Sequence, residues 1–288
     1  MSEFVCMTAA LCQRYPEVFF PIKLNLEVAG VEVKIIHKTE NVWIRDYFPI
    51  SINNKLFRFQ YKTIGYEDYP QLDVSNEPWT GVFNKPIYVN SIILDGGNII
   101  HGFDRIIMTE KVIQDNGKGV VADLEKLLGT RAIIIPVEPG DNLGHSDGIC
   151  KIIDVNHILI NDYSQIAKRD KAFINYQKEL EQILVSYGFW IYKIPNAYDQ
   201  WQWSMTEKQF RQLFPSADDF NPGFGYYINF LKVADTILLP AMKIKEDAEA
   251  YQVVKKHYPE CRVVMVDCSR LSMEGGLVNC ISAGPYTV

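Results

Sequence analysis

The chain has 288 residues, 48% of them apolar, which is enough to bury a large core in one or two domains. Its formal net charge of -6 disfavours nucleic acid as a partner and is compatible with cationic small molecules. No run approaches the roughly 18 apolar residues of a membrane-spanning helix. We therefore expect neither a nucleic-acid nor a membrane partner.

The six cysteines include no Cys-x-x-Cys pair, so we expect neither a disulfide framework nor a zinc site. They are Cys6, Cys12, Cys150, Cys261, Cys268 and Cys280. The first residues carry no basic segment and no clear cleavage signature, which a secretory signal peptide would have. These features predict a cytoplasmic protein with reduced thiols.

Cys280 differs from the other cysteines because it closely follows the glycine pair Gly275-Gly276 near the end of the chain. A cysteine is a strong nucleophile only as a thiolate, so a reactive Cys280 needs charged or proton-accepting partners and an open backbone around it. Suitable side chains are spread along the sequence. They are Asp46, Asp95, His145 and Asp147.

These candidates recur at a nearly constant distance. Asp46, Asp95 and His145 are separated by 49 and 50 residues, and Asn229 precedes Cys280 by 51 residues. A period of this size indicates repeated structural units, each of which carries one polar or reactive residue at the same point.

The segment from Trp43 to Ile52 has the composition of a strand, and Leu56 to Phe59 would return as its hairpin partner across Asn53-Asn54. A carboxylate inside such a strand, as Asp46 would be, is costly unless it is paired or lines a cavity. A structural ion pair with Arg45 is the alternative to a functional Asp46.

Two further segments combine glycines with ionisable residues. In the strand-like run 92–100, Gly96-Gly97 after Asp95 indicates a bulge or the close approach of another group. His145 and Asp147 are expected in a strand, with both side chains on one face. A histidine satisfied within the core is the alternative to a catalytic one.

Apolar periodicity predicts helices over 120–128, 170–187 and 246–257, the first with Gly129 as its C-cap. Strands are expected over 131–137, 189–194, 226–233 and 262–266, with Asn229 at the centre of the third.

The segment Pro195 to Gly225 is the one long insertion in this pattern, and it concentrates Asp199, Trp201 and Trp203. Long loops inside compact domains are usually lids or binding segments. The aromatic rings could cover a cationic substrate through cation–π contacts. Alternatively, the tryptophans anchor the insertion in the core.

Recurring strand, hairpin and helix units predict an α/β fold in which five units close into a ring, as one domain over residues 1–288. Such a ring would bring the marked residues together on its axis. They are Asp46, Asp95, His145, Asp147, Asn229 and Cys280.

Five short motifs, in this order, resemble the agmatine deiminase and bacterial-type peptidyl-arginine deiminase family of guanidino-modifying enzymes. This family has the pentein fold, a five-bladed α/β-propeller of ββαβ units around an axial active site. The motifs are Trp-x-Arg-Asp-x-x-Pro (43–49), acid-Gly-Gly-Asn (95–98), Gly-His-x-Asp (144–147), Tyr-x-Asn-Phe (227–230) and Gly-Gly-x-x-x-Cys (275–280).

The resemblance implies a role for each marked residue. Cys280 would be the nucleophile and His145 the general acid and base, while Asp95 would pair with the histidine or the substrate. Asp46 and Asp147 would clamp the planar guanidinium. The other predicted substrate-binding residues are Asn229 and Trp43, within the motifs, and Trp201 and Trp203, in the long insertion. Neither a metal nor an organic cofactor is expected.

The expected partner is a small cationic guanidino substrate, and the expected reaction is its hydrolytic deimination through a cysteine thiouronium intermediate. Agmatine, converted to N-carbamoylputrescine and ammonia, is the first choice of substrate. Peptidyl-arginine deimination, amidino transfer to an amine, and a non-catalytic binding protein on the same fold are the alternatives. A homo-oligomer is left open.

Two site positions depart from the family pattern. Asp95 stands in place of the usual glutamate, and Asn279 in place of the usual histidine before the cysteine. The stretches before the first unit and after the cysteine are also short. These departures leave the chemistry intact and bear on the choice of substrate.

Overall fold

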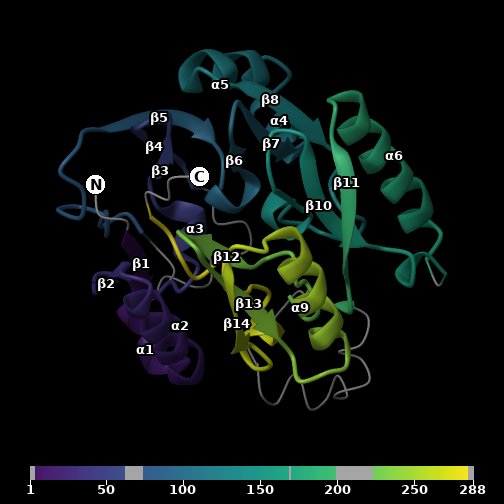
Figure 1. Cartoon of the computed structure of the whole chain (residues 1–288). Helices are drawn as coiled ribbons and strands as arrows, with labels where there is room; N and C mark the ends of the chain where they lie inside the picture. Colours follow the sequence, from purple (N-terminus) through teal and green to yellow (C-terminus); the bar gives the residue numbers. More distant parts are fainter. Residues whose placement is uncertain (1–3, 62–73, 169, 199–222, 285–288) are drawn as a thin grey trace.

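The computed structural model describes residues 4–61, 74–168, 170–198 and 223–284 (Figure 1). Over these ranges the chain has a mixed α/β fold. The strands are β1 (Phe4–Thr8), β2 (Glu32–Ile36), β3 (Ile50–Ile52), β4 (Lys55–Gln60), β5 (Ile87–Ile93), β6 (Ile100–Gly102), β7 (Arg105–Thr109), β8 (Arg131–Ile135), β9 (Cys150–Ile152), β10 (His157–Asp162), β11 (Trp190–Pro195), β12 (Leu231–Val233), β13 (Thr236–Ala241) and β14 (Arg262–Asp267). The α-helices are α1 (Ala9–Arg14), α2 (Pro16–Val28), α3 (Ile44–Tyr47), α4 (Lys111–Asn116), α5 (Val120–Leu128), α6 (Ala172–Ser186) and α9 (Glu246–His257). Short 3₁₀ turns cover Gly96–Asn98, Ser146–Gly148, Ile166–Lys168 and Leu271–Glu274.

Within the described ranges the strands form five small sheets, four of which share one three-stranded topology. In each of these four, two strands form an antiparallel hairpin, and the next strand in sequence pairs in parallel with the second. Parallel neighbours cannot be joined by a tight turn, so the chain needs a crossover. Helices α4 and α5, α6, and α9 lie in three of these crossovers, and α5 and α6 lie at the periphery of the molecule (Figure 1).

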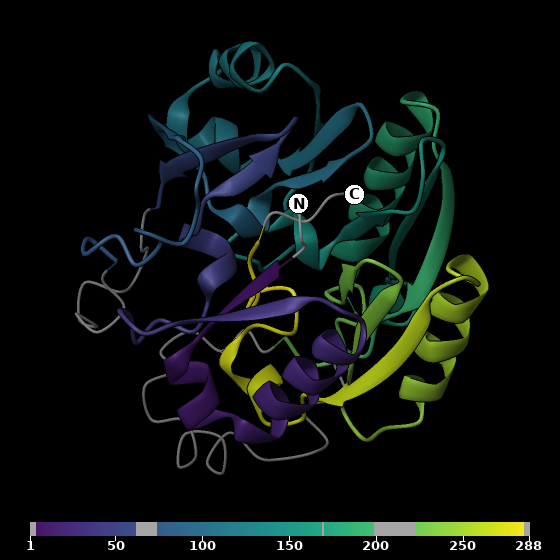
Figure 2. The ribbon, with the colours of Figure 1, turned by 60° about the vertical axis from the view of Figure 1, so that its left-hand side comes forward.

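The fifth sheet is assembled from the two ends of the described chain. Strands β1 and β2 pair in parallel across the helices α1 and α2. Ala283 forms an antiparallel bridge to Cys6 in β1, with hydrogen bonds in both directions between their backbones. Figure 2 shows the C-terminal segment, in yellow, running beside the purple β1. The segment that carries Cys280 is thereby fixed to the N-terminal strand.

Several predicted elements are confirmed. The hairpin of β3 and β4 turns at Asn53 and Asn54, both with positive φ, a conformation that asparagine tolerates better than most residues. Helix α5 ends at Gly129 in the left-handed conformation, as predicted. Helix α9 has the predicted bounds.

None of the helices within the described ranges is long and apolar enough to cross a bilayer.

The sequence pattern gave no indication of helix α2. Its inner face is buried through Val18, Phe19, Ile22 and Leu26, yet Phe20, Leu24 and Val28 are exposed by 57%, 61% and 69%. Apolar residues on both faces remove the contrast by which an amphipathic helix is detected. Pro16 at the start of the helix and Pro21 inside it weaken the signal further.

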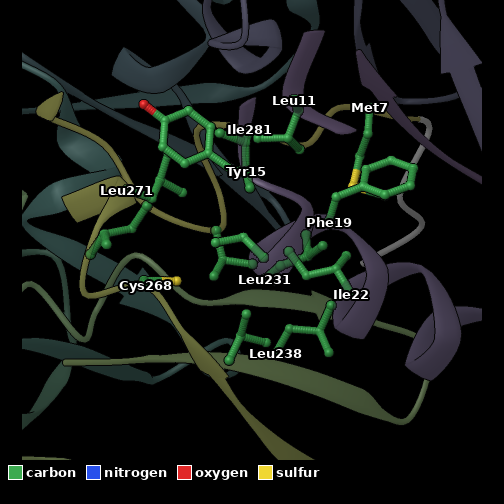
Figure 3. Packing of buried hydrophobic residues seen from close by; sticks show 14 of the residues in the cluster. Met7, Leu11, Tyr15, Phe19, Ile22, Leu231, Leu238, Cys268, Leu271 and Ile281 are labelled. Atoms are coloured by element: carbon green, nitrogen blue, oxygen red, sulfur yellow. The ribbon is translucent and has the colours of Figure 1, made fainter. Parts of the chain in front are cut away.

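The buried face of α2 contributes to a core that joins the two ends of the chain (Figure 3). Leu11, Phe19 and Ile22 from the N-terminal helices pack in one cluster with Leu238 of β13 and Leu271 near the C-terminus. Full burial of each such side chain contributes about 1.5–3 kcal/mol. This core holds the Cys280 segment against the rest of the molecule.

Sequence periodicity does not show which sheet the strands expected over 189–194 and 262–266 join. In the structure β11 pairs with β10 and β14 pairs with β13, so each of these strands closes the sheet of the hairpin before it. Each three-stranded sheet therefore starts after the polar residue that was predicted to mark its unit, and β9, for example, begins just after Asp147. Pairing is non-local, and sequence periodicity alone cannot assign a strand to one sheet or another.

Four of the residues predicted to lie in strands lie elsewhere. Asp46 is in the helical turn α3, followed by Pro49, and β3 begins only at Ile50. His145 and Asp147 are not alternating strand positions, because Asp147 lies in the 3₁₀ turn Ser146–Gly148 and His145 precedes it. Asn229 lies in a turn before β12, where its backbone N–H donates to Tyr226 O. Short apolar runs do not distinguish strands from turns.

Candidate active site

A cavity whose empty space, its open mouth included, is about 550 Å³ lies where the turns before two of the sheets meet the segment that carries Cys280. Four of the predicted site residues line it: His145, Asp147, Asn229 and Cys280. We call these four the reactive cluster. The other described lining residues are Glu138, Asp141, Leu143, Gly148, Ile149, Gly223, Tyr226, Gly275, Gly276 and Leu277.

The imidazole of His145 lies between two carboxylates. Its Nε2 hydrogen-bonds Asp95 Oδ2 at 3.2 Å, and its Nδ1 is 3.7 Å from Asp46 Oδ1. Asp46 Oδ1 also accepts the backbone N–H of Gly97 at 3.1 Å. The three segments that carry these residues are 49 and 50 residues apart in sequence, and the fold brings their side chains together.

The absence of side chains at Gly96 and Gly97 lets Arg45, Asp46 and His145 lie close to this segment. A Cβ at Gly96 would lie 1.9 Å from the backbone oxygen of Arg45. A Cβ at Gly97 would lie 2.5 Å from His145 Nδ1 and 2.8 Å from Asp46 Oδ1. The prediction that another group approaches these glycines closely is confirmed, and the group is the histidine with its carboxylate partner.

Burial lowers the pKa of His145, but the carboxylates of Asp46, Asp95 and Asp147 outweigh this effect and raise it overall. Burial raises the pKa of Asp46, as do Asp95 and Asp147, against the opposing influence of His145. An imidazolium held between carboxylates is thus the form that this geometry favours at neutral pH. It is suited to donate a proton to a leaving group.

The Cys280 thiol contacts two groups from other segments. Its Sγ is 3.4 Å from Asn229 Oδ1 and 4.0 Å from Asp147 Oδ2. Burial raises the pKa of this thiol, and the charges of Asp147 and Asp46 raise it further. Without a cation in the cavity, the site therefore favours the neutral thiol.

The backbone around Cys280 is held by the same partners. Asn229 Oδ1 and the Asn229 carbonyl both accept the N–H of Asn279, each at 3.1 Å. The N–H of Arg45 donates to Cys280 O at 3.1 Å. Trp43 packs against the glycine pair, since a Cβ at Gly276 would lie 2.4 Å from the indole ring.

The other predicted site residues occupy different places. Asp95 lines a smaller pocket beside the main cavity, together with Lys111, Asp115 and Leu143. Trp201 and Trp203 lie outside the described residues, as does Asp199, so the predicted lid stays a prediction. Among the described residues no group of three or more His, Cys, Asp or Glu side chains could hold a metal ion.

Glu138 was missed by sequence analysis. This buried residue lines the cavity, and its two carboxyl oxygens accept hydrogen bonds from the hydroxyls of Tyr163 and Tyr226. Burial raises the pKa of Glu138 to about 8, although both tyrosine hydrogen bonds oppose the shift. Glu138 precedes Pro139-Gly140 in a loop, and only its partners from positions 163 and 226 distinguish it from a surface glutamate.

Lys151 is a second charged residue that sequence analysis did not select. It follows Asp147 by four residues, in β9, and its Nζ donates to Phe230 O at 2.8 Å. Burial lowers its pKa to about 8, while Asp147 and Cys280 favour its charged form. Its hydrogen bond ties the turn that carries Asn229 to the strand that follows Asp147.

The sequence matches the model of the Porphyromonas-type peptidyl-arginine deiminase family over residues 5–284. The chain therefore belongs to this family, which confirms the resemblance seen in the motifs. An agmatine deiminase of Pseudomonas fluorescens is 22% identical, with the alignment covering 90% of this chain and 78% of the relative.

Two solved structures extend the comparison. A C. jejuni agmatine deiminase with substrate bound superposes with a TM-score of 0.74 at 16% identity, covering 99% of this chain and 94% of the other. A DDAH from Pseudomonas aeruginosa complexed with citrulline gives 0.57 at 13% identity, covering 99% of both chains. At these identities the likeness shows a shared α/β fold.

Proposed function

We propose that this protein deiminates a small guanidino compound by hydrolysis, with Cys280 as nucleophile. Membership of a deiminase family makes it a hydrolase that cleaves a C–N bond of a guanidino group. The observation that carries the proposal is the meeting of Cys280, Asp147 and Asn229 with a doubly carboxylate-flanked His145 at one cavity. We further propose that residues 1–288 form one domain, a five-bladed ring with this cavity on its axis.

In the proposed reaction, a guanidinium binds to Asp46 and Asp147, whose carboxylates match its donors. Its positive charge offsets the carboxylates that raise the pKa of Cys280, and the thiol proton passes to solvent through the open mouth of the cavity while His145 keeps its own proton. The thiolate then attacks the central carbon. The resulting tetrahedral adduct collapses when His145 transfers its proton to the departing nitrogen, which leaves as ammonia.

The remaining thiouronium is hydrolysed through the same imidazole. Neutral His145 takes a proton from water as the oxygen attacks the carbon, and cleavage of the C–S bond frees the Cys280 thiolate. The product carries a ureido group. Guanidino compound and water are consumed, ureido compound and ammonia are formed, and no oxidant or cofactor enters the balance.

Glu138 supports agmatine as the substrate. Its carboxyl group lines the cavity but forms no hydrogen bond with the reactive cluster within the described part of the chain. An alkylguanidine with a second, distal ammonium could place that charge near Glu138 and Asp141. An arginine residue in a peptide has only neutral amides at the corresponding position, so it would gain no charge interaction with this carboxyl.

The test is ammonia release from agmatine, free arginine and an internal-arginine peptide, without any acceptor amine. We expect the highest kcat/KM with agmatine. Preference for the peptide would favour protein citrullination instead. Turnover that requires an added amine would identify an amidinotransferase, and binding without turnover would identify a non-catalytic protein.

A further inference from the structure

Asn279, the residue where the family pattern has histidine, links Arg45 to Asp147. Its Nδ2 donates to Asp147 Oδ2 at 2.7 Å, and its Oδ1 accepts from Arg45 Nη2 at 3.3 Å. The Nε of Arg45 also donates to the backbone oxygen of Asn279 at 3.3 Å. A chain of hydrogen bonds thus runs from the first motif through the residue before Cys280 to the third motif.

The chemistry of the two neighbours fixes which way the amide points. A guanidinium can only donate hydrogen bonds, and an ionised carboxylate can only accept them. The amide oxygen of Asn279 must therefore face Arg45, and its NH₂ group must face Asp147. The opposite orientation would place donor against donor at Arg45 and acceptor against acceptor at Asp147.

This arrangement engages one oxygen of Asp147 and leaves the other available. Within the described residues no donor hydrogen-bonds Asp147 Oδ1, and Asp147 lines the cavity. A carboxylate that is held at Oδ2 can present Oδ1 to a guanidinium without first losing rotational freedom. The same Oδ2, which accepts the amide hydrogen bond, is 4.0 Å from Cys280 Sγ, so the amide contacts the carboxylate oxygen that lies beside the thiol.

We infer that Asn279, oriented by Arg45, is a positioning residue. Its NH₂ group holds the Asp147 carboxylate in place to receive the guanidinium, and it partly offsets the negative charge on Asp147 Oδ2, which would otherwise disfavour the Cys280 thiolate. The first half of this inference rests on the proposed function, and the second half concerns the thiol alone. A neutral amide supplies this hydrogen bond at every pH. A histidine at position 279 would supply it in a form that depends on its own protonation.

The test uses the full-length protein and the variant Asn279→Leu, which keeps the approximate volume and removes both hydrogen bonds. We expect KM for agmatine to rise about tenfold with a smaller change in kcat, because Asp147 contacts the cation both before and during reaction. Asn279→His restores a donor at this position, and we expect it to recover most of the loss near neutral pH. Arg45→Met combined with Asn279→Leu should cost less than the sum of the two single changes, since both interrupt one chain.

A second readout needs no substrate. Alkylation of Cys280 by iodoacetamide, followed by mass spectrometry of its peptide, reports the thiolate fraction. The charged or titratable groups that act on this thiol are Asp46, Asp147 and Lys151, and His145 lines the same cavity. We expect Asn279→Leu to move the alkylation profile to higher pH by roughly one unit, and Asp147→Asn to move it to lower pH.

The outcomes separate the two halves. An Asn279→Leu protein that keeps its thermal melting temperature, its KM and its alkylation profile would overturn the inference. A lower melting temperature with equal losses across all guanidines and an unchanged alkylation profile would make Asn279 merely structural and would overturn it too. If the wild type released no ammonia from any guanidine, the proposed function would fail, and a shifted alkylation profile would still support the link from Asn279 to the thiol.

Discussion

The cavity contains two groups of ionisable residues that are held in different ways. In the reactive cluster, charged or reactive groups contact one another or a neighbouring carboxylate, as Cys280 lies near Asp147 and His145 contacts Asp95 beside the cavity. Glu138 instead receives hydrogen bonds from two neutral tyrosine hydroxyls. Contacts among charged groups couple their protonation states, which suits proton transfer to and from a substrate. Hydrogen bonds from neutral hydroxyls hold the Glu138 carboxyl group in place, which suits recognition of a substrate.

The largest expected effect tests the reactive cluster itself. Cys280→Ala should lower kcat by at least about 10³-fold, because no other group can form the covalent intermediate. Stability should change little, since the thiol lines a cavity. The matched control is Cys261→Ala, which removes a buried thiol outside the cavity and should retain wild-type kcat/KM. Residual turnover of Cys280→Ala within a few-fold of wild type would remove Cys280 from the mechanism.

The next effect concerns the geometry around His145. Gly97→Ala would insert a methyl group 2.5 Å from His145 Nδ1 and separate the imidazole from Asp46. We expect kcat/KM to fall about 100-fold, the size of effect that a displacement of ~1 Å produces in an active site. Unfolding in urea should show a loss of about 1–3 kcal/mol from overpacking.

Gly119→Ala is the control for this change. A Cβ at Gly119 has nothing within 4 Å, and the residue has a negative φ of -75°. Both activity and stability should stay near wild type. If Gly97→Ala behaved like Gly119→Ala, the close packing of the glycine against the histidine would have no functional consequence.

A smaller effect separates recognition from chemistry. Glu138→Gln keeps the shape and removes the group that could ionise beside a bound ammonium, so kcat/KM for agmatine should fall about tenfold. Turnover of pentylguanidine, which has a neutral tail of similar length, should be unchanged. Glu179→Gln, an exposed change on α6, serves as the control. Equal losses with both substrates would assign Glu138 to the structure of the cavity and not to specificity.

The smallest effect is a dependence on pH. The pKa of His145 is raised above its ordinary value of 6.5, because the surrounding carboxylates outweigh the effect of burial. Its protonated form therefore stabilises the folded protein fully below about pH 6.5, and this contribution is lost as pH rises through the folded-state pKa. We expect urea unfolding to show wild type losing stability from pH 6 to pH 9 relative to His145→Asn. The kcat/KM of wild type should decline only as pH approaches the folded-state pKa of His145, about 10.

The sequence alone identified four of the residues that line the cavity, because reactive side chains beside glycines recur at a spacing of about 50 residues, which indicates a repeated unit. It also determined the hairpins and three of the helices, whose signals are local: the turn at Asn53-Asn54, the cap at Gly129 and the apolar face of α9. Local signals need no knowledge of distant contacts.

Only the tertiary structure decided how these residues are held. Asp46, His145 and Asn229 were expected in strands and lie in or beside turns, because backbone hydrogen bonds such as Arg45 N–H to Cys280 O come from segments more than 200 residues away. Glu138 has no distinguishing neighbours in sequence, and Asn279 stands out only because it precedes Cys280 and departs from the family pattern. The contacts of both residues come from Tyr163, Tyr226, Arg45 and Asp147, which folding brings to them. A sequence pattern records which groups are available, whereas the free energy of burying them depends on partners that only the folded chain supplies.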